Sequence, residues 1–229
     1  NNSQTSLLID TDTSITGSFF CFGSIDEPVC EDIALHLQPA VGETIADESS
    51  NNHQITIQGN ATVDNTATLF GGGTMHFDGV GDYLSVAHSD LFNFGSDDFT
   101  VEFWINFTTT TKQDTGSTGT VVMSHGDGSI SSTWGWMIYG SGGNLSFFAH
   151  VSGGNWSGSL PIMDSITTNR WHHIAVSKKS GMIRVYVDGI ARANSSWDNT
   201  QHPAIQSVTQ PLIIGKSFFS NRDEFDGQI

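Results

Sequence analysis

The sequence predicts an all-β protein on three observations. Short apolar runs of strand length recur along the chain, and Gly, Asn and Asp separate them at intervals near ten residues, as in sandwiches and barrels. Residues 99–107 (FTVEFWINF) place an apolar residue at every odd position, which is typical of a strand with one buried face. No segment longer than two turns shows the 3.6-residue apolar period of a helix.

The N-terminal residues 1–32 do not share this rhythm. Their apolar runs at 7–9 and 19–22 lie in a Thr/Ser/Asp background, which predicts an extended arm or an extra strand pair. Cys21 and Cys30 are the only cysteines, and their even number and loop context favour a disulfide over two free buried thiols. A disulfide closing so short a loop would stabilise the fold by roughly 2–3 kcal/mol.

The main domain is expected to cover residues 33–229. Its first predicted strand, 33–37, is stopped by Pro39, because proline cannot donate a ladder hydrogen bond. Residues 42–53 then read as a polar loop that is dense in carboxylate and amide oxygens. The alternation of Ile and polar residues predicts the next strand at 53–58.

Residues 71–107 form the scaffold around which the chain is organised. Two glycine turns at 78–82 precede a short strand at 83–86, and one capped helical turn is expected at 89–92. Trp104 is the one aromatic on the otherwise polar face of the long strand. Beyond a low-complexity loop at 108–119, further strands are predicted at 120–124, 135–139, 145–151, 171–177, 182–187 and 212–215.

Composition narrows the possible partners. The chain has 229 residues, which suits one all-β domain, and 24 acidic against 8 basic residues give a net charge of −16. This charge repels phosphate backbones, so no nucleic acid partner is expected. No apolar run approaches the length of a membrane span, and the chain begins without a signal-like segment. A surface of small polar residues favours an extracellular, cell-surface or virion-surface location.

Several segments together carry a family resemblance. In order, they read ADESSNNHQITIQGNATV, FGGGTMHFDGVGDYLSV, DFTVEFWINF, RWHHIAVSKKSGMIRVYVDG, PLIIGKS and FDGQI. This order resembles the concanavalin A-like lectin/glucanase superfamily, and within it the laminin-G-like (pentraxin-type) jelly-roll domain. The resemblance implies a two-sheet antiparallel β-sandwich with six or seven strands in each sheet. It also implies carbohydrate binding or adhesion, with ligands on the concave face or its loop rim.

The sequence departs from the family pattern at two points, and both affect which features of the family are expected in this chain. The family usually adds a strand with an acidic pair after the final F-x-G-x-I, so we expect residues 33–229 to lack the closing strand. Many relatives hold a structural Ca²⁺ between that pair and the opening loop. Here the loop has Ser50 where the family usually has Gly, and it offers oxygens from Asp47, Asn51 and Asn52. The alternative is that these side chains form turn hydrogen bonds to the backbone.

Candidate sugar-binding residues are aromatics in polar loop-like segments, since sugars stack on flat rings and hydrogen-bond to nearby polar groups. Trp104 and Trp171 lie in strands and are expected to pack there. For Trp156 and Trp197, a ligand platform and a lid over a sandwich edge remain equal alternatives. The predicted ligand-binding residues are Trp134, Trp136, Asn155, Trp156 and Trp197.

Catalytic and further metal sites are not expected. The paired-carboxylate spacing E-x-D-x-x-E of the superfamily's retaining glucanases does not occur. Adjacent strand residues point to opposite faces, so His172 and His173 cannot chelate one metal ion. His125 with Asp127 is explained as turn chemistry.

The predicted function is therefore a non-catalytic carbohydrate-binding or adhesion module of a larger surface protein. The alternative is a structural domain of a viral or bacterial fibre, tail or capsid decoration, with other subunits as partners. Candidate N-glycosylation sequons that need a secretory context begin at Asn60, Asn106, Asn144, Asn155 and Asn194.

Overall fold

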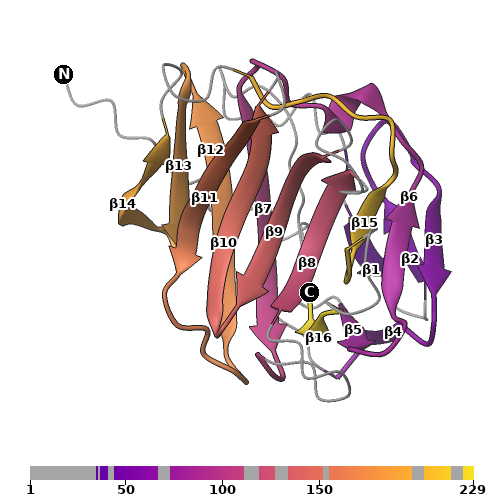
Figure 1. The fold of residues 1–229 in the computed structure, drawn as a ribbon. Helices are drawn as coiled ribbons and strands as arrows, with labels where there is room; N and C mark the ends of the chain where they lie inside the picture. Colours follow the sequence, from indigo (N-terminus) through magenta and orange to yellow (C-terminus); the bar gives the residue numbers. More distant parts are fainter. Residues whose placement is uncertain are drawn as a thin grey trace.

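The computed structural model describes residues 35, 37–40, 44–66, 73–110, 119–126, 134–151, 155–197, 204–217 and 224–229. Two seven-stranded antiparallel sheets pack face to face (Figure 1). The front sheet has the order β11-β10-β9-β8-β15-β6-β3, and the back sheet has the order β14-β13-β12-β7-β16-β5-β4. This arrangement confirms the predicted two-sheet sandwich.

The front sheet is built from strands that are far apart in the sequence. They are β3 (Ile55–Gln58), β6 (Tyr83–Val86), β8 (Gly119–Gly126), β9 (Trp134–Ser141), β10 (Asn144–Val151), β11 (Asn155–Met163) and β15 (Leu212–Ile214). The back sheet contains β4 (Thr62–Asp64), β5 (Thr74–Asp78), β7 (Phe99–Phe107), β12 (Trp171–Lys179), β13 (Met182–Val187), β14 (Ile190–Trp197) and β16 (Asp226–Gln228). A 3₁₀ turn, η1 (Asp90–Phe92), is capped by the Ser89 hydroxyl, as predicted.

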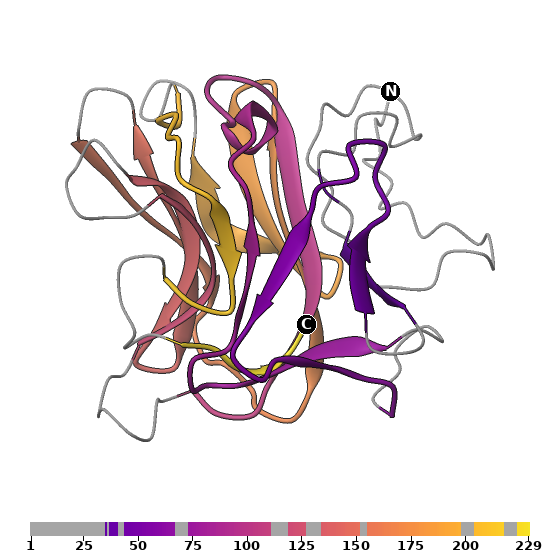
Figure 2. The same ribbon diagram turned by 90° about the vertical axis from the view of Figure 1, so that its right-hand side faces the viewer.

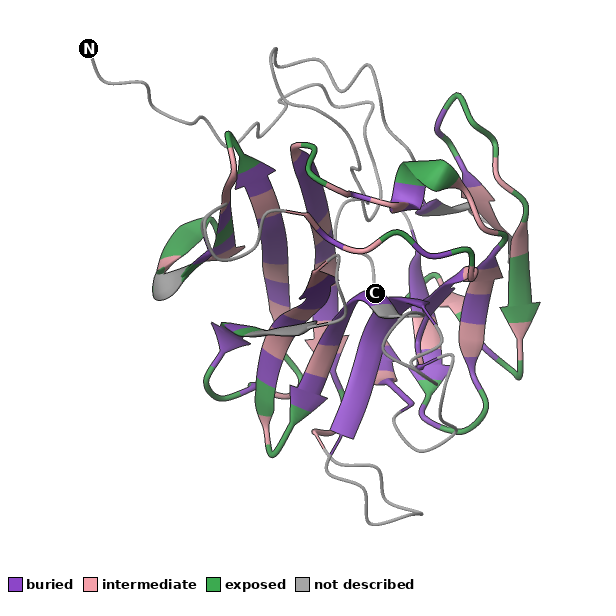
Figure 3. Cartoon of the chain, turned by 45° about the horizontal axis from the view of Figure 1, so that its top comes forward, coloured by how far each residue is buried: buried purple, intermediate pink, exposed green. Residues whose placement is uncertain are grey.

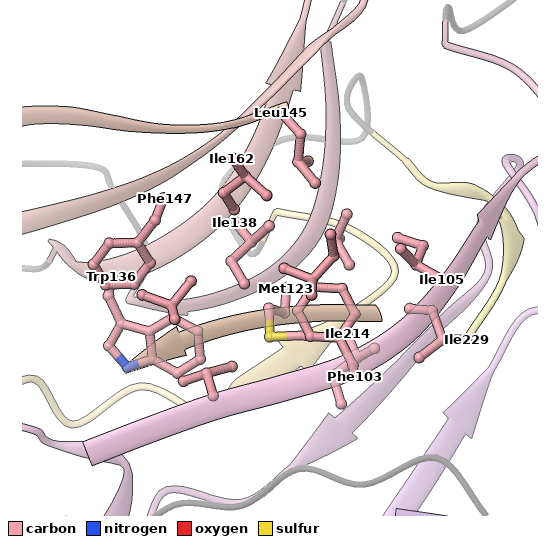
Figure 4. Packing of buried hydrophobic residues seen from close by; sticks show 14 of the residues in the cluster. Phe103, Ile105, Met123, Trp136, Ile138, Leu145, Phe147, Ile162, Ile214 and Ile229 are labelled. Atoms are coloured by element: carbon pink, nitrogen blue, oxygen red, sulfur yellow. The ribbon is translucent and has the colours of Figure 1, made fainter. Parts of the chain in front are cut away.

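Strand β7 confirms the alternation read from its sequence. Its odd-numbered residues are buried between the sheets, whereas Glu102, Trp104 and Asn106 are partly exposed on the outer face of the back sheet. The inward side chains meet those of the front sheet to form one core, shown in Figure 4 with Phe103, Trp136 and Phe147 among its members. Each such side chain stabilises the fold by about 1.5–3 kcal/mol.

A separate two-stranded sheet corrects the prediction for the first strand. Strand β1 (Leu37–Ala40) pairs with β2 (Thr44–Asp47), beside the back sheet in Figure 2. The chain therefore continues as a strand through Pro39 instead of stopping there. Because β1 has only one partner, it has an edge on which a missing N–H costs no ladder bond. The predicted arm at 1–32, with Cys21 and Cys30, lies outside the described residues.

The last described strand, β16, lies between β7 and β5 in the back sheet. Its Gly227 is opposite Phe107 on one side and Phe77 on the other. Beyond it, Ile229 and Met75 exchange two backbone hydrogen bonds of 2.8 and 3.0 Å. The final residues of the chain thus join two strands that are separated by more than twenty residues in the sequence.

Residues 204–208, called the strap below, cross one end of the sandwich on the way to β15 (Figure 1). Ile205 pairs with Val151 at the end of β10, and the Gln206 N–H donates to the His150 carbonyl at 2.8 Å. Val208 exchanges hydrogen bonds of 2.8 and 3.1 Å with the Asn93 side chain, just after η1. The strap therefore connects the front-sheet end to the η1 segment.

Candidate functional site

The backbone brings three of the predicted ligand residues to one end of the front sheet. Trp134 pairs with Gly126 at the start of β9, and Asn155 pairs with Val151 at the start of β11. Trp156 follows, opposite His150. The side chains of Trp134, Asn155 and Trp156 lie outside the described part of the structure. What is established is their common location, which we call the rim, next to the strap.

Two predicted ligand residues are buried instead, which corrects the expectation of exposed platforms. Trp136 is 1% exposed, and its Nε1–H donates to the Phe92 carbonyl at 3.0 Å. Trp197 is 8% exposed and lies against Phe147 with ring centroids 6.0 Å apart. Both rings face the core because strand alternation directs them inward. Neither is available to stack on a sugar.

An aromatic pair that the sequence analysis missed lies on the outer face of the front sheet. Tyr139 of β9 and Phe148 of β10 are both partly exposed, and their rings meet edge to face at 5.7 Å. Their neighbours Ile138 and Phe147 point into the core. Figure 3 shows this alternation as buried and more exposed bands along the front-sheet strands.

Small polar residues flank this aromatic pair. Ser146 is the cross-strand partner of Tyr139, and Ser159 is the partner of Phe148. Pro161, opposite Ser146 on β11, is exposed. The outer face of β9, β10 and β11 thus combines flat apolar rings with hydroxyl groups, and it continues to the rim. The signal that could have found it is alternation: Tyr139 and Phe148 occupy the outward positions of two predicted strands.

Of the predicted calcium ligands, Asp47 already accepts hydrogen bonds within the opening loop. The Asp47 carboxylate is completely buried and accepts hydrogen bonds from the Ser49 N–H (2.9 Å) and the His53 N–H (2.7 Å). It also contacts His53 Nδ1 at 2.8 Å. Asn51 and Asn52 are exposed, and Asn52 adopts a left-handed turn conformation with φ of 48°. This arrangement matches the alternative in which these side chains form turn hydrogen bonds.

We therefore expect excess EDTA to leave the melting temperature unchanged, whereas Asp47→Ala lowers the free energy of unfolding by about 1–3 kcal/mol. The substitution leaves the Ser49 and His53 donors unpaired in a buried place. Thermal melts with and without EDTA, and denaturant titrations of the variant, measure both effects. Glu48→Ala, at an exposed position of the same loop, is the control. A clear drop of the melting temperature in EDTA would support calcium binding by this loop.

Other carboxylates also have structural partners. Asp82 is 0% exposed and accepts the Asn60 N–H at 2.7 Å and the Asp78 N–H at 3.0 Å. Burial raises the pKa of Asp82, against the effect of these hydrogen bonds. Burial also raises the pKa of Asp226, which is paired with Asp78 across β16 and β5. In the described residues, no three His, Cys, Asp or Glu side chains are arranged to share a metal ion.

The adjacent histidines His172 and His173 point to opposite faces of the back sheet, as predicted. His172 points inward, is 4% exposed and contacts Asp188 through Nδ1 at 3.0 Å. His173 points outward, lies against the Trp104 ring at 5.2 Å and is 3.6 Å from Glu102. His125, expected in a turn, is instead a buried residue of β8, and Asp127 lies outside the described residues.

The sequons differ in accessibility. Asn60 and Asn144 are exposed, whereas Asn106 is a partly buried residue of β7. The side chains of Asn155 and Asn194 lie outside what the structure describes. Within the described ranges, the structure contains no helix of the length and apolar character needed to cross a membrane.

Comparison with known families agrees with this architecture. Residues 78–229 match the family model of the concanavalin A-like lectin/glucanases superfamily (Laminin_G_3). The chain belongs to this superfamily. The matched region runs from the end of β5 to the final strand, so it includes most strands of each sheet. A search of curated proteins finds no match to the chain.

Solved structures share the fold at low sequence identity. Domain 4 of AbnA, an extracellular GH43 arabinanase from Geobacillus stearothermophilus, was solved in complex with arabinotriose. It matches with a TM-score of 0.55 and 17% identity over 80% of this chain and 82% of that domain. The ligand-binding domain of botulinum neurotoxin serotype D, solved with N-acetylneuraminic acid, matches with a TM-score of 0.60 and 17% identity. The alignment covers 85% of this chain but only 46% of the toxin domain.

Proposed function

We propose that this domain is a non-catalytic carbohydrate-binding module that holds a glycan on the outer face of β9, β10 and β11. The observation that carries the proposal is the partly exposed Tyr139–Phe148 pair among Ser146, Ser159 and Pro161. Sugar rings present apolar C–H faces that stack on aromatic rings, and their hydroxyls need polar partners nearby. The superfamily membership and the arabinotriose complex of the similar arabinanase domain support this choice.

The proposed module acts outside the cell, as part of a larger secreted or surface protein. The similar arabinanase is itself extracellular. The acidic charge of −16 disfavours polyanionic partners, so neutral polysaccharides are the first ligands to test. No described residue set provides a paired-carboxylate site on the proposed binding face, and we assign no catalytic residue.

The proposal predicts that Tyr139→Ala and Phe148→Ala each weaken glycan binding by about tenfold or more, because each removes a stacking surface. A tenfold change in Kd corresponds to about 1.4 kcal/mol. Binding is first sought on a glycan array that includes arabinotriose and other neutral oligosaccharides, and Kd is then measured by calorimetry on the strongest ligand.

The matched control is Tyr186→Ala, which removes a partly exposed tyrosine from the outer face of the back sheet. This variant should bind like the unmodified chain. Trp156→Ala tests whether the rim contributes. Glycan binding that survives both front-sheet substitutions would contradict the proposed face, and binding to no glycan on the array would contradict the function. A defined oligomer in that case would favour the assembly-domain alternative.

A further inference from the structure

A buried and a partly exposed histidine stack at the end of the sandwich beside η1. His125 of β8 is 1% exposed, and the His88 ring stacks parallel to it, with centroids 5.8 Å apart and planes 7° from parallel. Neither ring nitrogen of His125, nor Nδ1 of His88, has a hydrogen-bond partner of good geometry. The Phe92 ring meets His125 edge-on at 5.9 Å, and the Trp136 ring lies 6.3 Å away.

This environment favours a neutral imidazole at His125. The backbone groups of Phe92 and Gln210 near His125 favour its charged form only weakly, and burial together with His88 lowers the pKa of His125 to about 4. A proton on His125 would place a charge in a buried site between the aromatic rings of Phe92 and Trp136. Opening this site to water would relieve the cost of that charge.

Among the described residues, few other ionisable groups face the pair. His88 Nε2 is 3.3 Å from Asp90. The Asp90 side chain is almost fully exposed, so water screens the charge of its carboxylate. His53, on the other side of Phe92, is held by the Asp47 carboxylate. The backbone carbonyl of His150 accepts a hydrogen bond from the strap. Burial lowers the pKa of the His150 side chain.

The pair is linked to the strap by short contacts. Phe92 lies between the histidines and Asn93, whose side chain exchanges two hydrogen bonds with Val208. The strap also packs against β9 beside His125: a Cβ on Gly135 would lie 2.6 Å from the His125 carbonyl and 3.2 Å from Val208 Cγ2. Ile205 donates its N–H to the Gly95 carbonyl at 2.8 Å. Displacing η1 would therefore break contacts that hold residues 204–208 on the rim.

We propose that the stacked His88 and His125 form an acid-sensitive latch, in which protonation of His125 displaces η1 and releases the strap from the front-sheet rim. The released strap then disturbs the end of β10, where Trp156 pairs with His150. Glycan affinity consequently falls under acid conditions. This last step rests on the proposed function, whereas the release of the strap does not.

The release is tested without a ligand, by NMR of the ¹⁵N-labelled chain from pH 7.5 to pH 3. The amides of Ile205, Gln206 and Val208 should shift or broaden in one acid transition, while core amides such as those of Phe103 and Val176 stay unchanged. His125→Phe should abolish the transition. His88→Phe should move its midpoint to higher pH, because His88 lowers the pKa of His125. The control His173→Phe, on the back sheet, should leave the midpoint unchanged.

If His125→Phe does not fold, His125→Gln is used in its place. Strap amides that do not titrate between pH 7.5 and pH 3, or that titrate equally in the His125 variants, would overturn the latch. Glycan affinity measured at pH 7.5 and pH 4 then tests the coupling: a strap that titrates while affinity stays constant overturns that step. Absence of glycan binding at pH 7.5 contradicts the proposed function alone, and the strap titration still decides the latch.

Discussion

Gly227→Ala is expected to lower the free energy of unfolding by at least about 3 kcal/mol, because the back sheet has no space for the added methyl group. Gly227 has a φ of 154°, which side-chain-bearing residues rarely adopt. A Cβ there would collide with the Asn106 carbonyl oxygen and lie 2.7 Å from the Phe225 ring and 3.1 Å from the Phe107 backbone. Backbone strain and overpacking each cost about 1–3 kcal/mol.

The measurement is urea-induced unfolding followed by circular dichroism. Gly142→Ala is the matched control: its φ is 62°, but nothing lies within 4 Å of the added atom. It should cost only about 1 kcal/mol, the penalty for the left-handed conformation alone. Equal costs for the two variants would show that β16 does not sit between β5 and β7 in solution.

The second large effect is a loss of stability on acidification that depends on His125. Burial and the neighbouring His88 lower the pKa of His125 from 6.5 in the unfolded chain to about 4 in the folded one. Between these values the unfolded chain binds a proton that the folded chain does not. Stability from this group is therefore complete above pH 6.5 and is lost as the pH falls towards 4. The expected loss is about 3 kcal/mol.

This loss can be separated from other titrations by comparing variants. The free energy of unfolding is measured at intervals from pH 7.5 to pH 4 for the unmodified chain and for His125→Phe. The variant should lack the His125 contribution, so its curve should be flatter by about 3 kcal/mol over this range. Burial raises the pKa of Asp82 and Asp226, so these groups favour the folded state at low pH and act in the opposite direction. Parallel curves would contradict a neutral, buried His125.

Strands with strong alternation could be predicted from the sequence, and those at the edges could not. Strand β7 has partners on both sides and one buried face, so its composition alternates clearly. Strands β11 and β14 are the outermost strands of their sheets, and their sequences are rich in Ser, Asn and Gly or Ala. An edge strand has one neighbour and less burial, so its sequence carries a weaker pattern. Accordingly, the sequence predicts no strand at either of these two positions.

The candidate site, too, could be predicted from the sequence only in part. Sequence composition drew attention to the tryptophans, because large aromatics in polar segments suggest sugar binding. Whether such a ring is exposed depends on which face of the strand it occupies and on what packs against it. Trp136 satisfies its indole N–H with the Phe92 carbonyl, from a segment more than forty residues away, and so can be buried. Tyr139 and Phe148 became a candidate pair only when β9 and β10 were placed in register.

The sequence by itself determined the all-β class, the long central strand, the capped turn at η1 and the superfamily, because these depend on local periodicity and on motif order. Tertiary structure decided which aromatics face the solvent, that the Asp47 carboxylate binds its own loop, and that His88 and His125 stack under η1. These features join residues distant in the chain, and their chemistry follows from burial and partners that a linear pattern does not record.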